Sequence, residues 1–194
     1  MDRVVTATRP SGDQRLAIEL DGKRWISLDV LTAARLGLAE GRALDERAVE
    51  AAEDEARRER ALRRAARLVG RRSHARADLE RRVSRSDGEA AAAAAAARLA
   101  ELGALDDQRH AGEVAAHRLG AGWGPARIEH DLLADGVDEA IVRACIAGLA
   151  DDAVDEAARR ALGTRTGAAG WQRLAARGFD EDVAERLLGE PTGA

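Results

Sequence analysis

The side chains of two histidines and one glutamate are the first candidates for chemistry in this sequence, as possible ligands of a metal ion. His110, Glu113 and His117 lie near one face of a helix predicted over residues 107–119. Imidazole and carboxylate groups are ordinary zinc ligands. The spacing, however, is not His-Glu-x-x-His, and no cysteine ligand lies nearby. We therefore interpret the three as polar helix residues and expect no metal and no cofactor.

The adjacent carboxylates of Asp106 and Asp107 are a second candidate, because paired carboxylates can share acid–base work. They follow a turn at Gly103 and come directly before a predicted helix. Aspartate is a preferred residue at a helix N-terminus, where its oxygen accepts backbone N–H groups. The capping interpretation is therefore favoured. No Ser–His–Asp arrangement can be argued from the spacing, so an enzyme is not expected.

The single cysteine, Cys145, belongs to an apolar row with Ile141, Val142 and Ile146. This pattern predicts a buried structural thiol and not a nucleophile. One cysteine allows no internal disulfide, which fits a reducing cytoplasm. No apolar run is long enough to cross a membrane, so we expect a cytoplasmic protein. His74 and His130 have no evident partner in the sequence.

The glycine-rich segment 120–124 is a candidate phosphate loop, since backbone N–H groups in such loops bind phosphates. It reads Gly-Ala-Gly-Trp-Gly and is not followed by Lys-Ser/Thr. It also does not follow a predicted strand. We interpret it as a turn between helices.

Arginine dominates the basic residues, because Lys23 is the only lysine among 31. Residues 57–88 hold 12 arginines and 4 acidic residues, a net charge of +8, whereas residues 1–56 carry −4 and residues 89–194 carry −8. Such a local excess is a candidate footprint for an anionic partner. The candidate contact residues are Arg60, Arg63, Arg64, Arg67, Arg71, Arg72, Arg81, Arg82 and Arg85.

Three interpretations of this arginine cluster stay open. At helical spacing, Arg60, Arg64, Arg67 and Arg71 would lie along one stripe, which would bind phosphates with salt-sensitive affinity. The same stripe would fit an acidic protein surface. It would also serve as a solvated helix face, or pair with the acidic C-terminal part of the chain. No aromatic residue interleaves with the arginines, so base stacking is not expected.

The N-terminal part predicts a small sheet. Its β-prone runs are residues 4–8, 15–20 and 23–28. Asp21-Gly22 predicts a two-residue hairpin turn, because glycine tolerates the positive φ that such turns require. In this register, Ile18 would face Trp25 and Glu19 would face Arg24. Three short strands are marginal alone, so we expect helical support, with a short helix over residues 29–36.

The remainder predicts helices that repeat. Their expected ranges are residues 45–69, 76–83 and 89–102, then 107–119, 125–134 and 138–149, then 153–162, 168–176 and 180–188. Gly136-Val137-Asp138 returns farther along the chain as Gly178-Phe179-Asp180. We therefore predict a mainly α fold: three tandem three-helix repeats in an elongated curved array, after a small β-rich extension. The expected domains are residues 1–45, 46–104, 105–150 and 151–190, and a single irregular bundle is the alternative.

These motifs resemble the RecX family of bacterial modulators of the RecA recombinase, over roughly residues 57–188. The basic–hydroxyl step Arg71–Ser73, with the following Asp78-Leu79, resembles the first repeat. The residues that carry the family pattern are Leu79, Leu102, Gly103, Leu105, Asp106, Asp107, Arg109, Ala111, Gly136, Arg177, Gly178 and Phe179. The chain departs from the pattern at Ala75, where the family usually has Ser or Thr, and at His110, where an aromatic residue is expected. Ser73 would cap the helix two residues earlier.

The resemblance implies a non-enzymatic, monomeric regulator that binds RecA. It implies binding along the groove of the RecA filament on single-stranded DNA, with negative effects on ATP hydrolysis, strand exchange and coprotease activity. This is a role in DNA repair and the SOS response. A curved array would touch several protomers at once and gain avidity. The alternative is a stand-alone nucleic-acid-binding helical module that uses the arginine-rich first repeat.

Overall fold

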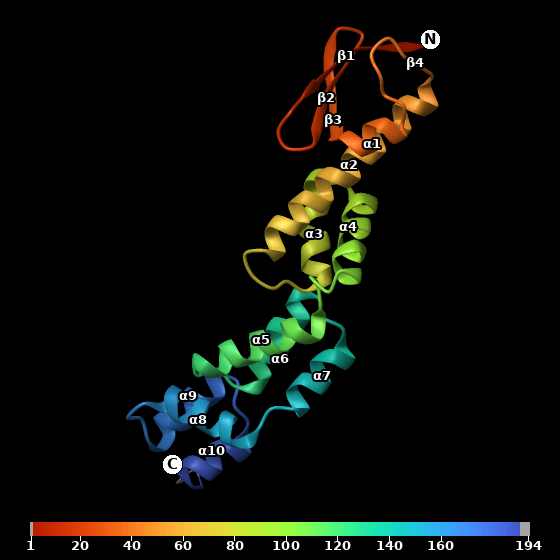
Figure 1. Cartoon of the computed structure of the whole chain (residues 1–194). Coiled ribbons are helices and arrows are strands. Elements are labelled where there is room, and N and C mark those ends of the chain that lie inside the picture. The colour runs from red at the N-terminus through yellow and green to blue at the C-terminus, as the bar shows by residue number, and fades with distance from the viewer. Residues whose placement is uncertain (1, 191–194) are drawn as a thin grey trace. The chain divides into compact units, whose positions relative to one another are not determined.

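A computed structural model describes residues 2–190 of the chain (Figure 1). These residues fall into two compact units: unit 1 contains residues 2–67 and 80–99, and unit 2 contains residues 68–79 and 100–190. The described part of the chain holds four strands and ten helices, which confirms the mainly helical fold with a small N-terminal sheet. The division into three repeats with the expected boundaries stays a prediction.

The sheet of unit 1 is antiparallel, with strand order β3-β2-β1-β4. Its strands are β1 (Arg3–Pro10), β2 (Arg15–Leu20), β3 (Lys23–Asp29) and β4 (Ala43–Leu44). Asp21 and Gly22 both have positive φ, at 51° and 76°. The predicted hairpin turn is therefore confirmed.

The predicted hairpin register is half wrong. Glu19 does pair with Arg24, but Ile18 pairs with Ile26, because the register shifts between these two pairs. Trp25 is the extra residue of this bulge. Its indole Nε1 donates a hydrogen bond to Glu53 Oε1 of the next long helix, over 2.9 Å. The bulge thus keeps Ile26 in the core while the indole reaches a polar partner.

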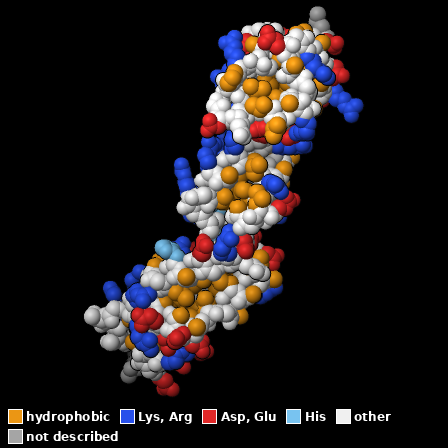
Figure 2. All heavy atoms as spheres, in the orientation of Figure 1, with side chains coloured by type: hydrophobic (Ala, Val, Ile, Leu, Met, Phe, Trp, Pro, Cys, Tyr) orange, Lys and Arg blue, Asp and Glu red, His pale blue; other side chains and the backbone are white. Residues whose placement is uncertain are grey.

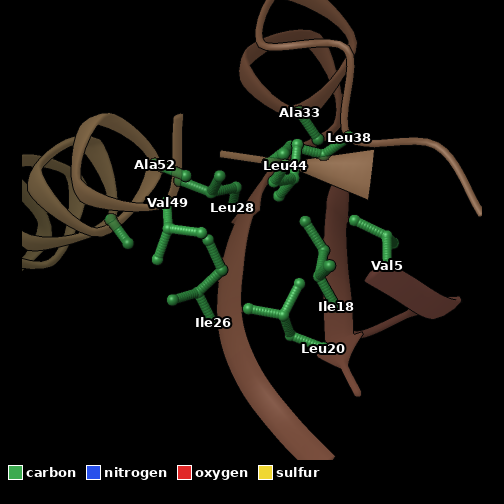
Figure 3. Packing of buried hydrophobic residues seen from close by; sticks show 11 residues of the cluster. Val5, Ile18, Leu20, Ile26, Leu28, Ala33, Leu38, Leu44, Val49 and Ala52 are labelled. Carbon is green, nitrogen blue, oxygen red and sulfur yellow. The ribbon is translucent and has the colours of Figure 1, made fainter. Parts of the chain in front are cut away.

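The core of unit 1 forms where one face of the sheet meets α1 (Val30–Arg35) and α2 (Glu46–Val69) (Figure 3). Ile18, Leu20 and Leu28 of the sheet are fully buried there. Asp45 begins α2 by accepting the Ala48 N–H over 2.7 Å. Farther along α2, Glu59 Oε2 accepts a hydrogen bond from Arg15 Nη1 of the sheet over 2.9 Å. The sheet is therefore supported by a helix, as expected.

Two more helices complete this part of the chain, α3 (Arg76–Asp87) and α4 (Glu89–Glu101). The first four residues of α3 belong to unit 2 and the others to unit 1. α3 extends past the predicted end at residue 83, and it stops before Gly88, whose φ is +83°. α4 contains the alanine run, and it buries Ala91, Ala92, Ala95 and Ala96.

Unit 2 contains six more helices, and the sequence indicated the turn or cap before four of them, α5, α6, α7 and α10. They are α5 (Asp107–Gly120), α6 (Pro125–Asp135), α7 (Glu139–Ala147), α8 (Asp151–Leu162), α9 (Gly167–Ala176) and α10 (Glu181–Leu188). One buried cluster centres on Ile128 and Leu132, and a second on Leu174 and Phe179. Gly120 is the last residue of α5, and residues 121–124 form the turn between α5 and α6, so the prediction of a turn between helices is confirmed. Among residues 2–190, no helix combines the length and apolarity that crossing a bilayer requires.

Candidate partner-binding surface

Two of the nine predicted contact arginines hold a buried carboxylate. Asp87 has a side chain only 2% exposed, and Arg64 Nε lies 2.8 Å from it. Arg60 Nε lies 3.6 Å from the same carboxylate. A buried charge without a partner is strongly destabilising, so these arginines have a structural role in unit 1. The spacing of the arginines gave no sign of this shared acidic partner.

The other arginines of the cluster differ in whether they form ion pairs or hydrogen bonds. Arg63 lies 3.5 Å from Glu59, and partial burial lowers the pKa of its guanidinium. Arg81 and Arg82 are exposed, but both take part in side-chain interactions. The residues that are exposed and have no ion pair or side-chain hydrogen bond within residues 2–190 are Arg67, Arg71, Arg72 and Arg85.

The charges are mixed on the molecular surface. Figure 2 shows acidic side chains close to basic ones over the visible face of each unit. Arg71 and Arg72 belong to unit 2, whereas Arg67 and Arg85 belong to unit 1. The residues of the predicted stripe, from Arg60 to Arg71, are therefore divided between the two units. We treat the exposed arginines of each unit separately.

The Asp106-Asp107 pair caps two different helices. Asp106 Oδ1 accepts the Arg109 N–H over 3.0 Å and so begins α5. Asp107 Oδ1 accepts the Arg76 N–H over 2.8 Å and so caps α3 from a distance of 31 residues in sequence. The capping interpretation is confirmed for Asp106. Ala75, the residue before α3, is fully buried and has no side-chain oxygen. Asp107 therefore supplies the cap of α3.

The residues around this pair hold the loop that precedes α5. Arg109 donates to the carbonyl oxygens of Gly103 and Ala104, over 3.2 and 3.3 Å. Leu79, Leu105 and Ala111 are buried. Leu102 is different: its side chain is 61% exposed, so this position of the family pattern does not serve the core.

The histidines are placed by neighbours that the sequence did not reveal. His110 is 2% exposed, and its Nδ1 lies 3.1 Å from Ser73 Oγ. Ser73 therefore bonds to a histidine where we expected a helix cap. His74 is buried with Nδ1 3.0 Å from Asp78 Oδ2, and His130 Nδ1 lies 3.4 Å from Asp131 Oδ1. The expectation that His74 and His130 lack partners was wrong, because each has an aspartate close by along the chain.

His110, Glu113 and His117 do line one hollow of unit 2, about 510 Å³ in volume, together with Asp131 and Asp135. His110 Nε2 makes no hydrogen bond within the described part of the chain, and it lies 3.5 Å from Asp135 Oδ2. No three His, Cys, Asp or Glu side chains among residues 2–190 are arranged to hold a metal ion.

Cys145 is only partly buried, which corrects the expectation of a buried thiol. It borders a hollow of about 340 Å³ beside Ala111 and Gly112 of α5, so solvent reaches it. Within its row of α7, only Val142 is fully enclosed. Burial still raises the pKa of the thiol, so Cys145 is a thiol and not a reactive thiolate at neutral pH.

The turn at Arg177-Gly178 is bonded to the beginning of α6. The Arg177 carbonyl accepts the Gly124 N–H over 2.8 Å, and the Gly178 carbonyl accepts the Ala126 N–H over 3.1 Å. These bonds satisfy N–H groups that a helix N-terminus leaves free. The Arg177 guanidinium lies 4.1 Å from the centre of the Trp123 ring. Sequence reasoning missed Trp123, because its partner belongs to a distant turn of the chain.

The second predicted repeat and the chain as a whole both match known proteins. The family model described as RecX, second three-helix domain, matches residues 106–146. The chain is 35% identical over 136 residues to the regulatory protein RecX of Stenotrophomonas maltophilia (strain K279a), covering 64% of this chain and 83% of that protein. It is 36% identical over 132 residues to the regulatory protein RecX of Pseudomonas putida (strain W619), covering 62% and 84%.

Solved structures show the same fold. A crystal structure of a regulatory protein RecX matches with a TM-score of 0.72 and 18% identity, covering 95% of this chain and 98% of that one. RecX from Lactobacillus salivarius matches with a TM-score of 0.59 and 17% identity, covering 70% and 95%. With relatives of this identity and coverage, the chain belongs to the RecX family.

Proposed function

We propose that this protein binds RecA filaments on single-stranded DNA and lowers their recombinase, ATPase and coprotease activities. The observation that carries the proposal is membership of a family whose curated relatives are named regulatory proteins. That naming supports a regulatory role. RecA as the partner, and the negative sign of regulation, are the finer steps proposed here.

Unit 2 offers a contact for this partner in Arg71 and Arg72. Both are exposed in the segment that precedes α3, and neither has an ion pair within the described residues. A partner's carboxylate or phosphate would bind them without breaking an existing ion pair. Guanidinium groups suit both anions, because their planar N–H donors match two oxygens at once.

ATP hydrolysis by RecA on single-stranded DNA tests the proposal. Adding the purified protein should lower the turnover rate, and turnover that is unchanged at saturating protein would refute it. In the variant R71E/R72E, the concentration for half-maximal inhibition should rise about tenfold, since reversed charges repel the partner. The control R47E/R143E changes the net charge equally at two other exposed arginines. If both variants inhibit alike, Arg71 and Arg72 are not the contact.

The alternative is a module that binds nucleic acid by itself through the arginines of residues 57–85. The ion pairs of Arg60 and Arg64 with Asp87 leave fewer arginines for this role. The variant R67E/R85E tests it, because it reverses exposed charges and spares the buried carboxylate. DNA binding without RecA that disappears in this variant would favour the alternative.

A further inference from the structure

The acidic C-terminal part of the chain contains a stretch without any acidic residue. Residues 157–179 hold five arginines and no Asp or Glu, although residues 89–194 have a net charge of −8. The stretch covers the second half of α8, all of α9 and the loop between these two helices, which lie side by side (Figure 1). Basic charge is therefore concentrated locally within unit 2.

Two of the five arginines have carboxylate partners. Arg159 lies 3.8 Å from Asp155, and Arg160 lies 3.2 Å from Glu156. The other three form no ion pair with a carboxylate among the described residues, and they are Arg165, Arg173 and Arg177.

Backbone carbonyls and an indole hold two of these three guanidinium groups in place. Arg173 Nε donates to the Ala161 carbonyl over 3.2 Å. Arg177 Nη1 donates to the Ala121 carbonyl over 3.4 Å, and its guanidinium lies over Trp123. Arg165 is exposed in the α8–α9 loop. The contacts of Arg173 and Arg177 fix the positions of these two charges without neutralising them.

Arg173 is close enough to Arg177 and to Arg165 for their positive charges to act on its guanidinium. The charge of Arg177 is the main cause that lowers the pKa of Arg173, with smaller contributions from desolvation and from Arg165. Fixed like charges raise the energy of the free protein, and a bound anion removes that penalty. The observations therefore favour a ligand with several closely spaced negative charges.

A nucleic-acid strand matches this requirement, because each nucleotide adds one phosphate along a flexible chain. Arginine and threonine side chains are common phosphate contacts. The loop that carries Arg165 has exposed threonines on both sides, Thr164 and Thr166. The Trp123 ring already has Arg127 and Arg177 near it, at 5.2 and 4.1 Å, so it is not free for base stacking. Binding through this surface would depend on salt and not on sequence.

We infer that Arg165, Arg173 and Arg177 form a phosphate-binding surface for single-stranded nucleic acid. This surface lies outside the arginine cluster of residues 57–88. It does not require RecA, so the inference goes beyond the proposed function.

Fluorescence anisotropy with a labelled oligothymidylate, in the absence of RecA, tests the inference. The full chain should bind at low salt, with log K falling linearly as log [salt] rises. In the variant R165Q/R173Q/R177Q, the slope should decrease in magnitude by about 2, from roughly 0.7 for each lost phosphate contact. No binding by the full chain at low salt would overturn the inference.

Two controls keep the test decisive. R165E changes only an exposed loop residue, so it should fold normally and still weaken binding about tenfold. R143E, another exposed arginine of unit 2, should bind as the unmodified chain does. Equal binding by R165E and R143E would overturn the inference. Polyglutamate that competes as well as the oligonucleotide, charge for charge, would also overturn it, because the surface would then suit acidic proteins.

Discussion

Two turns of unit 2, at Gly136 and at Gly178, have the same local structure but different neighbours. Their glycines have φ values of 83° and 81°. In each turn, the next residue donates its N–H to the carbonyl of a buried leucine over 3.1 Å, as Val137 does to Leu132. An aspartate then caps the following helix in both turns. The echo in the sequence thus encodes one backbone conformation, used twice.

The neighbours of the two glycines differ. A Cβ on Gly136 would lie 2.7 Å from the side-chain Cβ of Ala77. A Cβ on Gly178 would lie 2.7 Å from the backbone nitrogen of Arg127, and a Cβ on Gly124 would lie 2.3 Å from the Gly178 carbonyl oxygen. The first turn packs against a methyl group, and the second against backbone. Identical turns can therefore tolerate substitution very differently.

The largest expected effect is that of G178A. The positive φ costs about 1–2 kcal/mol for any residue with a Cβ. The contact with the Arg127 backbone adds about 1–3 kcal/mol, because no side chain can move away. We expect a loss of about 4 kcal/mol in the free energy of unfolding, measured by urea denaturation. The control G112A adds a methyl group with no atom within 4 Å and should stabilise α5 by about 1 kcal/mol.

The second prediction distinguishes the two turns by a second substitution that should restore stability in one of them and not in the other. G136A should cost about 3 kcal/mol, from its positive φ and from the Ala77 contact. Adding A77G removes that contact, so a double-mutant cycle should give a favourable coupling of about 1 kcal/mol. A77G combined with G178A should show no coupling. Equal coupling in both cycles would refute the difference between the turns.

The third prediction concerns the cap beside the first turn. D107A removes the acceptor of the Arg76 N–H, and loss of a helix cap costs about 1 kcal/mol. D107N retains a side-chain oxygen and should lose less. Chemical denaturation compares the two variants. If D107A and D107N are equally stable, the contact from α5 to α3 does not support the segment against which Gly136 packs.

Local patterns were enough to predict many features. The Asp21-Gly22 hairpin, the glycine turns and the Asp106 cap depend on residues within a few positions of one another, so propensity and spacing indicate them. The bulge at Trp25 was not predictable, because its partner Glu53 is 28 residues away. The role of Asp107 depends on a helix that begins 31 residues earlier.

The predicted contact residues show the same limit. Helical spacing correctly places most of these arginines on α2 and α3, although Arg71 and Arg72 lie between the two helices. Spacing cannot show that Asp87 is buried against Arg60 and Arg64. Net charge led to the opposite error, because it hid arginines that have no carboxylate partner. A value of −8 for residues 89–194 concealed the acid-free stretch that holds Arg165, Arg173 and Arg177. Summed charge averages over helices whose neighbours decide which charges stay uncompensated.

The smallest expected effect is a pH dependence confined to the helices beside the second turn. Arg186 Nη2 lies 2.7 Å from Asp155 Oδ1 and joins α10 to α8. When the two turns are aligned on their glycines, the corresponding positions hold Glu113 and Ala144, which cannot form the same pair. The hydrogen bond from Arg186 lowers the pKa of Asp155 below its ordinary 3.8.

Because the folded pKa is lowered, the pair stabilises the protein above pH 3.8, and this contribution is lost as the pH falls through the folded value. The Tm of D155N should therefore be lower than that of the unmodified chain near neutral pH, and the difference should shrink as the pH falls below 3.8 and through the lowered folded pKa. E181Q, which neutralises an exposed carboxylate in the first turn of α10, should show no comparable pH-dependent difference. A Tm difference for D155N that persists unchanged in acid would mean that packing, and not the ion pair, holds α10 to α8.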